Sequence, residues 1–226
     1  MNDSAPVGRF GGRAIRRERW EIAGMCFDLA WPADMDALLD APETQRRHDL
    51  DGYMPYWAQP WPSSVLLAEA VLAGEPGAGR SAIEIGCGIG LASLAALRMG
   101  WVVTASDYDE EALLYAMLNA RTNGLRFAGV KSIDYREPLA EPAYDCVLAS
   151  GLLYEQRCCE PVARWVASAL RPGGFALLSD PNRTAAESFV GHAAAVGLRL
   201  EVRSVESKAP AGLLHRGRIW RATKAG

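Results

Sequence analysis

The chain has 226 residues, half of them hydrophobic, and its 24 basic and 27 acidic residues give a formal net charge of −3. This length fits one α/β domain with a full hydrophobic core and leaves little room for two. The balanced charge provides no general attraction to nucleic acid or to an anionic membrane, so we expect neither as a partner. No apolar stretch reaches the roughly 18 residues of a membrane span.

The five cysteines and three histidines show no metal-ligand spacing, since the sequence contains no CxxC pair. We therefore expect no metal site. Cysteines inside apolar runs read as small buried hydrophobes, and free thiols are typical of a reducing compartment. A cytoplasmic location is the expectation.

The chain is expected to divide into an N-terminal extension, residues 1–60, and a main domain, residues 61–226. The first 19 residues are rich in glycine and arginine and are predicted to be loose. Three patterns follow within the extension: a strand-like one over 19–30, a helical one over 32–39 and a polar, loop-like one over 40–52.

From residue 62 the pattern predicts a helix up to residue 72, with Pro62 in its first turn. Strands then alternate with helices to the end of the chain. The predicted strands cover residues 82–85, 101–106, 130–133, 144–149, 175–179, 198–205 and 216–221. The predicted helices cover residues 91–99, 109–123, 160–170 and 184–196.

This alternation implies parallel pairing with right-handed crossovers. The connection between the last two strands is too short for a crossover, so they must be antiparallel. The predicted fold is therefore α/β: a Rossmann-like, doubly wound, mostly parallel seven-stranded sheet. One strand near the C-terminus is antiparallel, and helices cover both faces.

The first predicted strand of the main domain runs directly into a glycine-rich loop, Glu84-Ile-Gly-Cys-Gly-Ile-Gly90. Gly86, Gly88 and Gly90 allow tight turns and close approach of the backbone to a ligand. The third glycine comes one residue too early for the dinucleotide fingerprint GxGxxG, and no GK[ST] follows. A pyrophosphate site is disfavoured and a P-loop is excluded.

Three acids lie at the ends of three successive predicted strands: Glu84, Asp107 and Asp134. Glu84 suits a cofactor with a cationic amino group and a sulfonium, Asp107 can accept two ribose hydroxyls, and Asp134 can accept an adenine amino group. Each acid alone could equally be a helix cap or hold a turn. Together around one glycine loop, they indicate S-adenosylmethionine (SAM).

These motifs resemble those of the seven-strand SAM-dependent methyltransferases over residues 53–222. Glu84 to Gly90 looks like their first motif, Asp107 like the ribose-binding acid, Asp134 like the adenine-side residue, and Arg171-Pro-Gly-Gly174 like the turn before the fifth strand. The resemblance implies SAM as cofactor and S-adenosylhomocysteine as product. The residues expected to complete the cofactor site neighbour these motifs: Cys87, Tyr108, Tyr135, Ser150, Trp57 and Trp61.

A narrower resemblance is to the protein-lysine methyltransferase-like branch that includes the electron-transfer flavoprotein β-subunit enzymes. It is carried by Tyr56-Trp-Ala-Gln-Pro-Trp-Pro62, Asp134-Tyr-Arg136 and the stretch from Asp145 to Glu155. The fourth strand of that branch usually ends with an acid, two apolar residues and tyrosine. Here Tyr154 is present, and Gly151 stands where the acid is expected.

The methyl group of SAM is already activated, so the enzyme must mainly orient a nucleophile, which can lower the barrier by ~7–11 kcal/mol. Tyr154 and Glu155 are predicted to face the methyl acceptor, with Ser150 supporting them. Trp57 and Trp61 either close over the methionine end of SAM or pack within the N-terminal region.

Four functions remain open. The first two are methyl transfer to a protein side chain, first of all lysine, and methyl transfer to a small-molecule amine or hydroxyl. The third is a SAM-binding module without catalysis, which Gly151 keeps open. A nicotinamide-dependent oxidoreductase is disfavoured by Leu91 and Glu84. The oligomeric state is not predicted.

Overall fold

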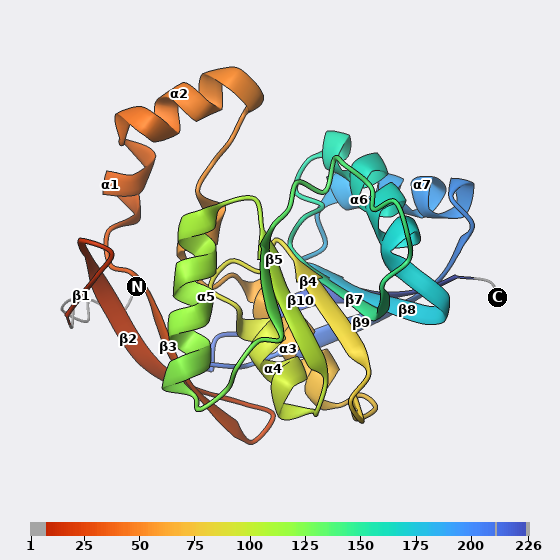
Figure 1. The fold of residues 1–226 in the computed structure, drawn as a ribbon, viewed down its shortest axis with the longest axis horizontal. Helices are drawn as coiled ribbons and strands as arrows, with labels where there is room; N and C mark the ends of the chain where they lie inside the picture. Colours follow the sequence, from red (N-terminus) through yellow and green to blue (C-terminus); the bar gives the residue numbers. More distant parts are fainter. Residues whose placement is uncertain (1–7, 211, 225–226) are drawn as a thin grey trace.

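The structure is a computed structural model that describes residues 8–210 and 212–224. A seven-stranded sheet in the order β6-β5-β4-β7-β8-β10-β9 forms its centre (Figure 1). Its strands are β4 (Ser81–Ile85), β5 (Val102–Asp107), β6 (Gly129–Ser132), β7 (Tyr144–Ser150), β8 (Leu170–Asp180), β9 (Leu198–Ser207) and β10 (His215–Lys224).

Neighbouring strands from β6 to β8 are parallel, and β10 is antiparallel to both β8 and β9. From β4 the chain winds outward through β5 to β6, then returns to β7 and β8 on the other side of β4. The order of strands thus reverses between β4 and β7, which is where doubly wound sheets bind ligands. The predicted α/β fold with one antiparallel strand is confirmed.

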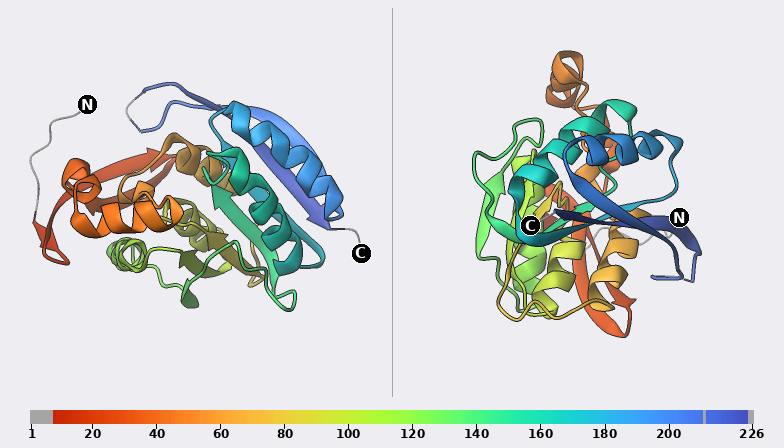
Figure 2. Two further views of the ribbon diagram at one scale, coloured as in Figure 1. Left: turned by 90° about the horizontal axis from the view of Figure 1, so that it is seen from above. Right: turned by 90° about the vertical axis from the view of Figure 1, so that its right-hand side faces the viewer.

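Helices cover both faces of this sheet, on opposite sides in the right-hand view of Figure 2. Each group of helices encloses its own cluster of buried hydrophobic side chains. One face carries α3 (Pro62–Leu72), α4 (Leu91–Arg98) and α5 (Glu110–Thr122), and the other carries α6 (Gln156–Ala169), the 3₁₀ turn η2 (Thr184–Ser188) and α7 (Phe189–Ala195). Among the described residues, no helix is both long and apolar enough to cross a membrane.

Local signals explain most helix ends. Pro62 is the first residue of α3, as expected, and Asp109 caps α5 by accepting a hydrogen bond from the backbone N–H of Glu111 at 2.8 Å. The start of α6 was predicted four residues too late. Pro161, which suits a first turn, instead lies inside the helix.

Three N-terminal strands form a second, antiparallel sheet: β1 (Arg9–Phe10), β2 (Arg13–Ile22) and β3 (Met25–Pro32). The prediction that the first 19 residues are loose is wrong from residue 9 onward, and residues 1–7 lie outside the described part. The single predicted strand is in fact a hairpin. Its two-residue loop, Ala23 and Gly24, has φ of +49° and +77°, as a tight hairpin turn requires.

Asn119 of α5 joins this hairpin to the main domain. Its fully buried amide accepts the N–H of Ala30 at 2.7 Å and donates to the carbonyls of Ala30 at 3.0 Å and Ile89 at 2.9 Å. Arg13 adds an ion pair to Glu111 at 2.6 Å. Because Ile89 belongs to the glycine-rich loop, one side chain connects the hairpin, α5 and that loop.

Two short helices, α1 (Met35–Leu39) and α2 (Pro42–Asp51), follow the hairpin, and η1 (Tyr56–Ala58) precedes α3. The prediction of a loop over residues 40–52 is wrong. Helix α2 begins at Pro42 and ends at Asp51, and the following Gly52 caps it with a φ of +75°. It stands away from the body of the molecule (Figure 1). Its sequence lacks an apolar stripe, and Thr44 is its one buried residue. The boundary at residue 60 remains a prediction.

Candidate functional site

A cleft of about 570 Å³ opens at the carboxyl ends of β4, β5 and β7. Its volume is within the ~300–1,000 Å³ that small-molecule and cofactor sites occupy. A second cavity of about 380 Å³ lies beside α3, β9 and β10 and contains no part of the glycine-rich loop. Most of the expected site residues line the first cleft: Trp57, Trp61, Gly86, Cys87, Gly88, Asp107, Tyr108, Asp134, Tyr135, Ser150, Tyr154 and Glu155.

The glycine-rich loop requires its glycines. Gly86, Gly88 and Gly90 have φ of +59°, +53° and +88°, values that other residues rarely adopt. A Cβ on Gly86 would lie 2.5 Å from Leu152 Cδ2, and one on Gly90 would lie 3.1 Å from Ala116 Cβ. Gly86 therefore keeps the cleft open, whereas Gly90 does not line the cleft and lets the loop pack on α5.

Asp107 ends β5 and faces the loop. Its Oδ2 accepts the backbone N–H of Gly88 at 2.8 Å, and its Oδ1 accepts that of Asp109 at 2.9 Å. Each oxygen retains a lone pair for a further donor, so the carboxylate can accept the two hydroxyls of a ribose. Burial raises its pKa to about 6, although the backbone hydrogen bonds act in the opposite direction.

Glu84 differs from its expected position. Its side chain is on the face of β4 that α4 covers, is fully buried and does not line the cleft. Oε2 accepts hydrogen bonds from the backbone N–H of Ser93 at 2.8 Å and from its hydroxyl, while Oε1 has no partner within the described residues. Burial raises the pKa of Glu84 to about 8. Glu84 thus fastens β4 to α4 instead of facing the cofactor.

The adenine side of the cleft is built from paired charges. Asp134 accepts the backbone N–H of Arg136 at 2.9 Å and forms an ion pair with its guanidinium at 2.6 Å. That guanidinium lies 5.3 Å from the ring of Tyr108, whose hydroxyl donates to Asp51 at 3.0 Å. Asp134 and Tyr108 line the cleft as expected, and their contact with adenine remains a prediction.

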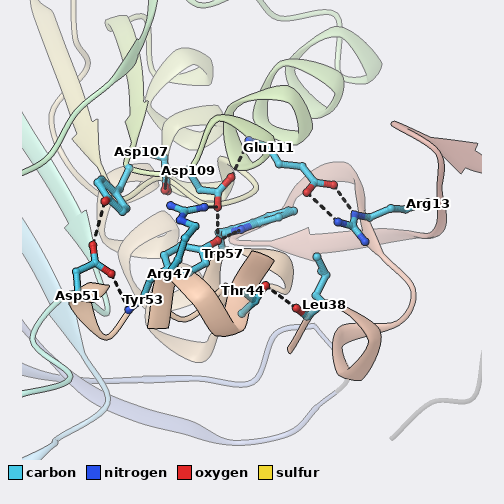
Figure 3. Close-up of polar contacts among 11 residues, drawn as sticks. Arg13, Leu38, Thr44, Arg47, Asp51, Tyr53, Trp57, Asp107, Asp109 and Glu111 are labelled. Atoms are coloured by element: carbon cyan, nitrogen blue, oxygen red, sulfur yellow. Dashed lines mark hydrogen bonds and ion pairs between the residues drawn. The ribbon is translucent and has the colours of Figure 1, made fainter. Parts of the chain in front are cut away.

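A polar network centred on Asp109 was not anticipated (Figure 3). The carboxylate of Asp109 accepts the Tyr53 hydroxyl and pairs with Arg47 Nη1 at 3.0 Å. The Arg47 guanidinium lies 3.5 Å above the Tyr53 ring, and Trp57 Nε1 donates to the Tyr53 hydroxyl at 3.2 Å. The sequence did not indicate this network, because its members are far apart in the chain and Arg47 lies in a segment that was predicted to be a loop.

The two tryptophans have different environments. Trp57 is buried, its ring lies 5.5 Å from that of Tyr115, and its backbone is the nearest neighbour of Gly88. Its ring thus packs on α5 of the main domain while the residue lines the cleft, and both alternatives for Trp57 remain predictions. Trp61 precedes α3 and lies edge-on to Tyr56 at 6.0 Å on the cleft wall, where contact with SAM remains a prediction.

The opposite wall follows β7. Tyr154 meets Tyr56 edge-on at 5.6 Å and also interacts with Tyr135. Burial raises the pKa of Tyr154 to about 12, so its hydroxyl is protonated at neutral pH and can donate a hydrogen bond. Glu155 forms an ion pair with Arg157, and both line the cleft.

Gly151 lies between Ser150 and this wall. Its φ is +68°, and a Cβ there would be 2.6 Å from Ser63 Oγ. Its carbonyl accepts a hydrogen bond from Arg183 Nη1 at 3.4 Å. An acidic residue at this position would be strained. The nearest charged group is the Arg183 guanidinium, which the sequence did not indicate as part of the site.

Comparison with known proteins gives the family. Residues 62–219 match a family model described as a methyltransferase domain. The electron transfer flavoprotein beta subunit lysine methyltransferase of Danio rerio is 29% identical over 133 residues, which are 57% of this chain and 51% of that protein. The ubiquinone biosynthesis O-methyltransferase of Xanthomonas axonopodis pv. citri is 34% identical over 116 residues, 48% of this chain and 46% of that protein. The chain thus spans about half the length of these curated relatives.

A solved TehB-like SAM-dependent methyltransferase from Corynebacterium glutamicum has the same fold, with a TM-score of 0.52 and 20% identity over 80% of this chain and 95% of that one. The glycine cradle and the free lone pairs of Asp107 fit the adenosyl part of SAM. Because the family model covers more than half of the sequence, this chain belongs to the methyltransferase domain family.

Proposed function

We propose that this methyltransferase transfers the methyl group to a nitrogen or oxygen atom of a small molecule, which binds between the glycine-rich loop and Tyr154. The observation that carries this proposal is the charge beside Gly151. A lysine ammonium must be attracted to the site and then lose a proton before it attacks. The group next to Gly151 is the Arg183 guanidinium, a cation that is paired with the buried Asp180, so this part of the wall offers no free carboxylate to attract an ammonium.

Aromatic rings form much of the wall at this end of the cleft. Tyr56 contacts both Trp61 and Tyr154 edge to face, an arrangement that leaves ring faces and edges for a flat apolar ligand. The similarity to a ubiquinone O-methyltransferase supports a small-molecule acceptor as well.

The residues of the chain would catalyse the reaction mainly by orientation. SAM, when bound, supplies an activated methyl group. Asp107 and the glycine-rich loop would fix its adenosyl part, and the Tyr154 hydroxyl would orient the acceptor through a hydrogen bond that leaves the attacking lone pair free. Glu155, which lines the same wall, is the group available to accept the proton that the acceptor releases once it leaves its ion pair with Arg157, and Ser150 can hydrogen-bond to the acceptor.

The second candidate is a protein lysine. It is favoured by the similarity to an electron transfer flavoprotein lysine methyltransferase. In this case Glu155 would have to leave its ion pair with Arg157 in order to accept the ammonium proton. Nucleic acid is not proposed as an acceptor, since the net charge of −3 offers no attraction for it.

A methylation assay separates the candidates. The enzyme is incubated with methyl-labelled SAM and a cell lysate that has been divided by size into small-molecule and protein fractions. The proposal expects label in the small-molecule fraction, and none with the Asp107→Ala variant, which removes the expected ribose acceptor. Label that migrates only with protein bands would favour lysine instead.

A further inference from the structure

We propose that Arg183 binds a carboxylate on the methyl acceptor, so that the acceptor is an aromatic acid with a hydroxyl or amino group as the methylated nucleophile. This inference rests on the proposed small-molecule function and names its substrate class.

Arg183 lies at the same edge of the sheet as the cofactor loop. It follows β8, which is paired with β7, and the Gly151 N–H donates to the Ser179 carbonyl at 3.0 Å. The guanidinium lines the cleft next to Gly151, with about a third of the side chain exposed. A cation is therefore available at the acceptor end of the cleft.

Asp180 holds this guanidinium in a fixed position. The carboxylate is completely buried, its Oδ1 accepts the Arg183 backbone N–H at 2.6 Å, and its Oδ2 meets Nη1 at 3.2 Å. Nη1 also donates to the Gly151 carbonyl at 3.4 Å. Within the part of the chain that the structure describes, Nε and Nη2 of Arg183 make no hydrogen bond, so the guanidinium retains donors for a ligand.

Arg183 is not the only cation that interacts with Asp180. Arg218 acts on the same carboxylate as Arg183, so two guanidinium groups face one buried acid. Glu187, which pairs with Arg218 at 3.9 Å, is largely exposed and therefore well screened. Arg183 and Arg218 therefore share Asp180, and the donors of Arg183 that Asp180 does not use are available to an anionic ligand.

The shape of the donors suits a carboxylate. A guanidinium presents planar, paired N–H groups that match the two oxygens of a carboxylate. Ser63 Oγ lies 2.6 Å from the point where a Cβ of Gly151 would be, and Ser150 adds a second hydroxyl on the cleft floor. The aromatic walls described above then suit the ring that carries the carboxylate.

The test measures binding to the complex of the full chain with S-adenosylhomocysteine. The two probes are 3,4-dihydroxybenzoate and its uncharged amide, 3,4-dihydroxybenzamide, titrated by calorimetry. The wild type is expected to bind the benzoate roughly tenfold or more tightly than the amide. Arg183→Gln is expected to bring this ratio close to one without changing the affinity for S-adenosylhomocysteine.

Three further variants serve as controls for this test. Arg183→Lys keeps the charge but loses the planar fork, so an intermediate ratio is expected. Asp180→Asn with Arg183→Gln removes the buried acid together with its partner, in case the single variant fails to fold. Arg216→Gln removes the same charge from an exposed pair with Glu206, outside the cleft, and should keep the wild-type ratio.

The inference is overturned if the wild type does not bind the benzoate, if it binds both probes equally, or if Arg183→Gln keeps the preference. These readouts need no turnover. They therefore differ from the lysate assay, in which label on protein would contradict the small-molecule function whatever Arg183 binds.

Discussion

The hydroxyl of Tyr53 donates a hydrogen bond to the carboxylate of Asp109, 56 residues further along the chain. The backbone N–H of Asp109 in turn donates to Asp107, the expected ribose acceptor, at 2.9 Å. The segment after α2 is thereby connected to the cofactor site through two successive contacts (Figure 3). The N-terminal region helps to position Asp107, in addition to covering the domain.

Replacement of Tyr53 by phenylalanine tests this connection. The change leaves the ring under Arg47 and removes one donor from the buried Asp109. We expect the affinity for S-adenosylhomocysteine to fall by about five- to thirty-fold, which corresponds to ~1–2 kcal/mol for a hydrogen bond to a charged group. Calorimetry measures this affinity directly.

Tyr144→Phe is the matched control, because the Tyr144 hydroxyl contacts Lys131 and does not line the cleft. It should bind S-adenosylhomocysteine as the wild type does. Equal affinities of all three proteins would show that the Tyr53 contact does not position Asp107.

Cofactor affinity should depend on pH through Asp107. Burial raises the pKa of this carboxyl to about 6, well above its ordinary value of 3.8. Only the ionised form accepts hydrogen bonds from both ribose hydroxyls, so affinity is expected to decrease as the pH falls through about 6. Titrations with S-adenosylhomocysteine between pH 5 and 8 would show this as a single step.

The Asp107→Asn variant carries no charge at this position. It should bind weakly throughout this range and lose the step. A step of the same size in the variant would assign the titration to another group and remove the evidence for an ionised Asp107 at the ribose.

Gly86 and Gly124 provide a matched pair for the glycine-rich loop. Both have left-handed φ, +59° and +68°, but a Cβ on Gly86 would collide with Leu152 while one on Gly124 would meet nothing within 4 Å.

Gly124→Ala should lower the free energy of unfolding by about 1 kcal/mol through backbone strain alone. Gly86→Ala should lower it by about 2–4 kcal/mol and also weaken cofactor binding. Denaturant unfolding and calorimetry on both variants check the difference, and equal losses would mean that Leu152 moves aside freely.

Much of the fold could be predicted because the central strands are short apolar runs bounded by turn residues. The site was harder to predict from the sequence, as Glu84 and Asp107 illustrate. Both are acids near strand ends, yet Glu84 precedes the last residue of β4 and points under α4, whereas Asp107 ends β5 and reaches the cleft. A shift of one residue changes the face of a strand, and the sequence does not fix where a strand ends to that accuracy.

The N-terminal errors have a different cause. Strand β2 buries only Ile15, Trp20 and Ile22, and its arginines give the segment the composition of a solvated tail. Helix α2 buries a single threonine. Arg183 could not be recognised for yet another reason, because it lies in a loop and only the pairing of β7 with β8 brings it next to Gly151.

The buried acid Glu84 gives the last prediction, which concerns stability. Its pKa is about 8 in the folded chain and 4.5 in the reference state. Folding therefore takes up a proton, and the stability present at acid pH is lost as the pH rises from about 4.5 through 8.

Glu84→Gln keeps the shape and an acceptor for Ser93 but cannot ionise. Relative to the wild type, it should gain on the order of a few kcal/mol in free energy of unfolding between pH 5 and pH 9. Urea unfolding at a series of pH values measures the difference, with Glu206→Gln as an exposed control. A constant difference across the range would mean that Glu84 remains ionised when buried, and that the Ser93 hydrogen bonds outweigh the cost of burying its charge.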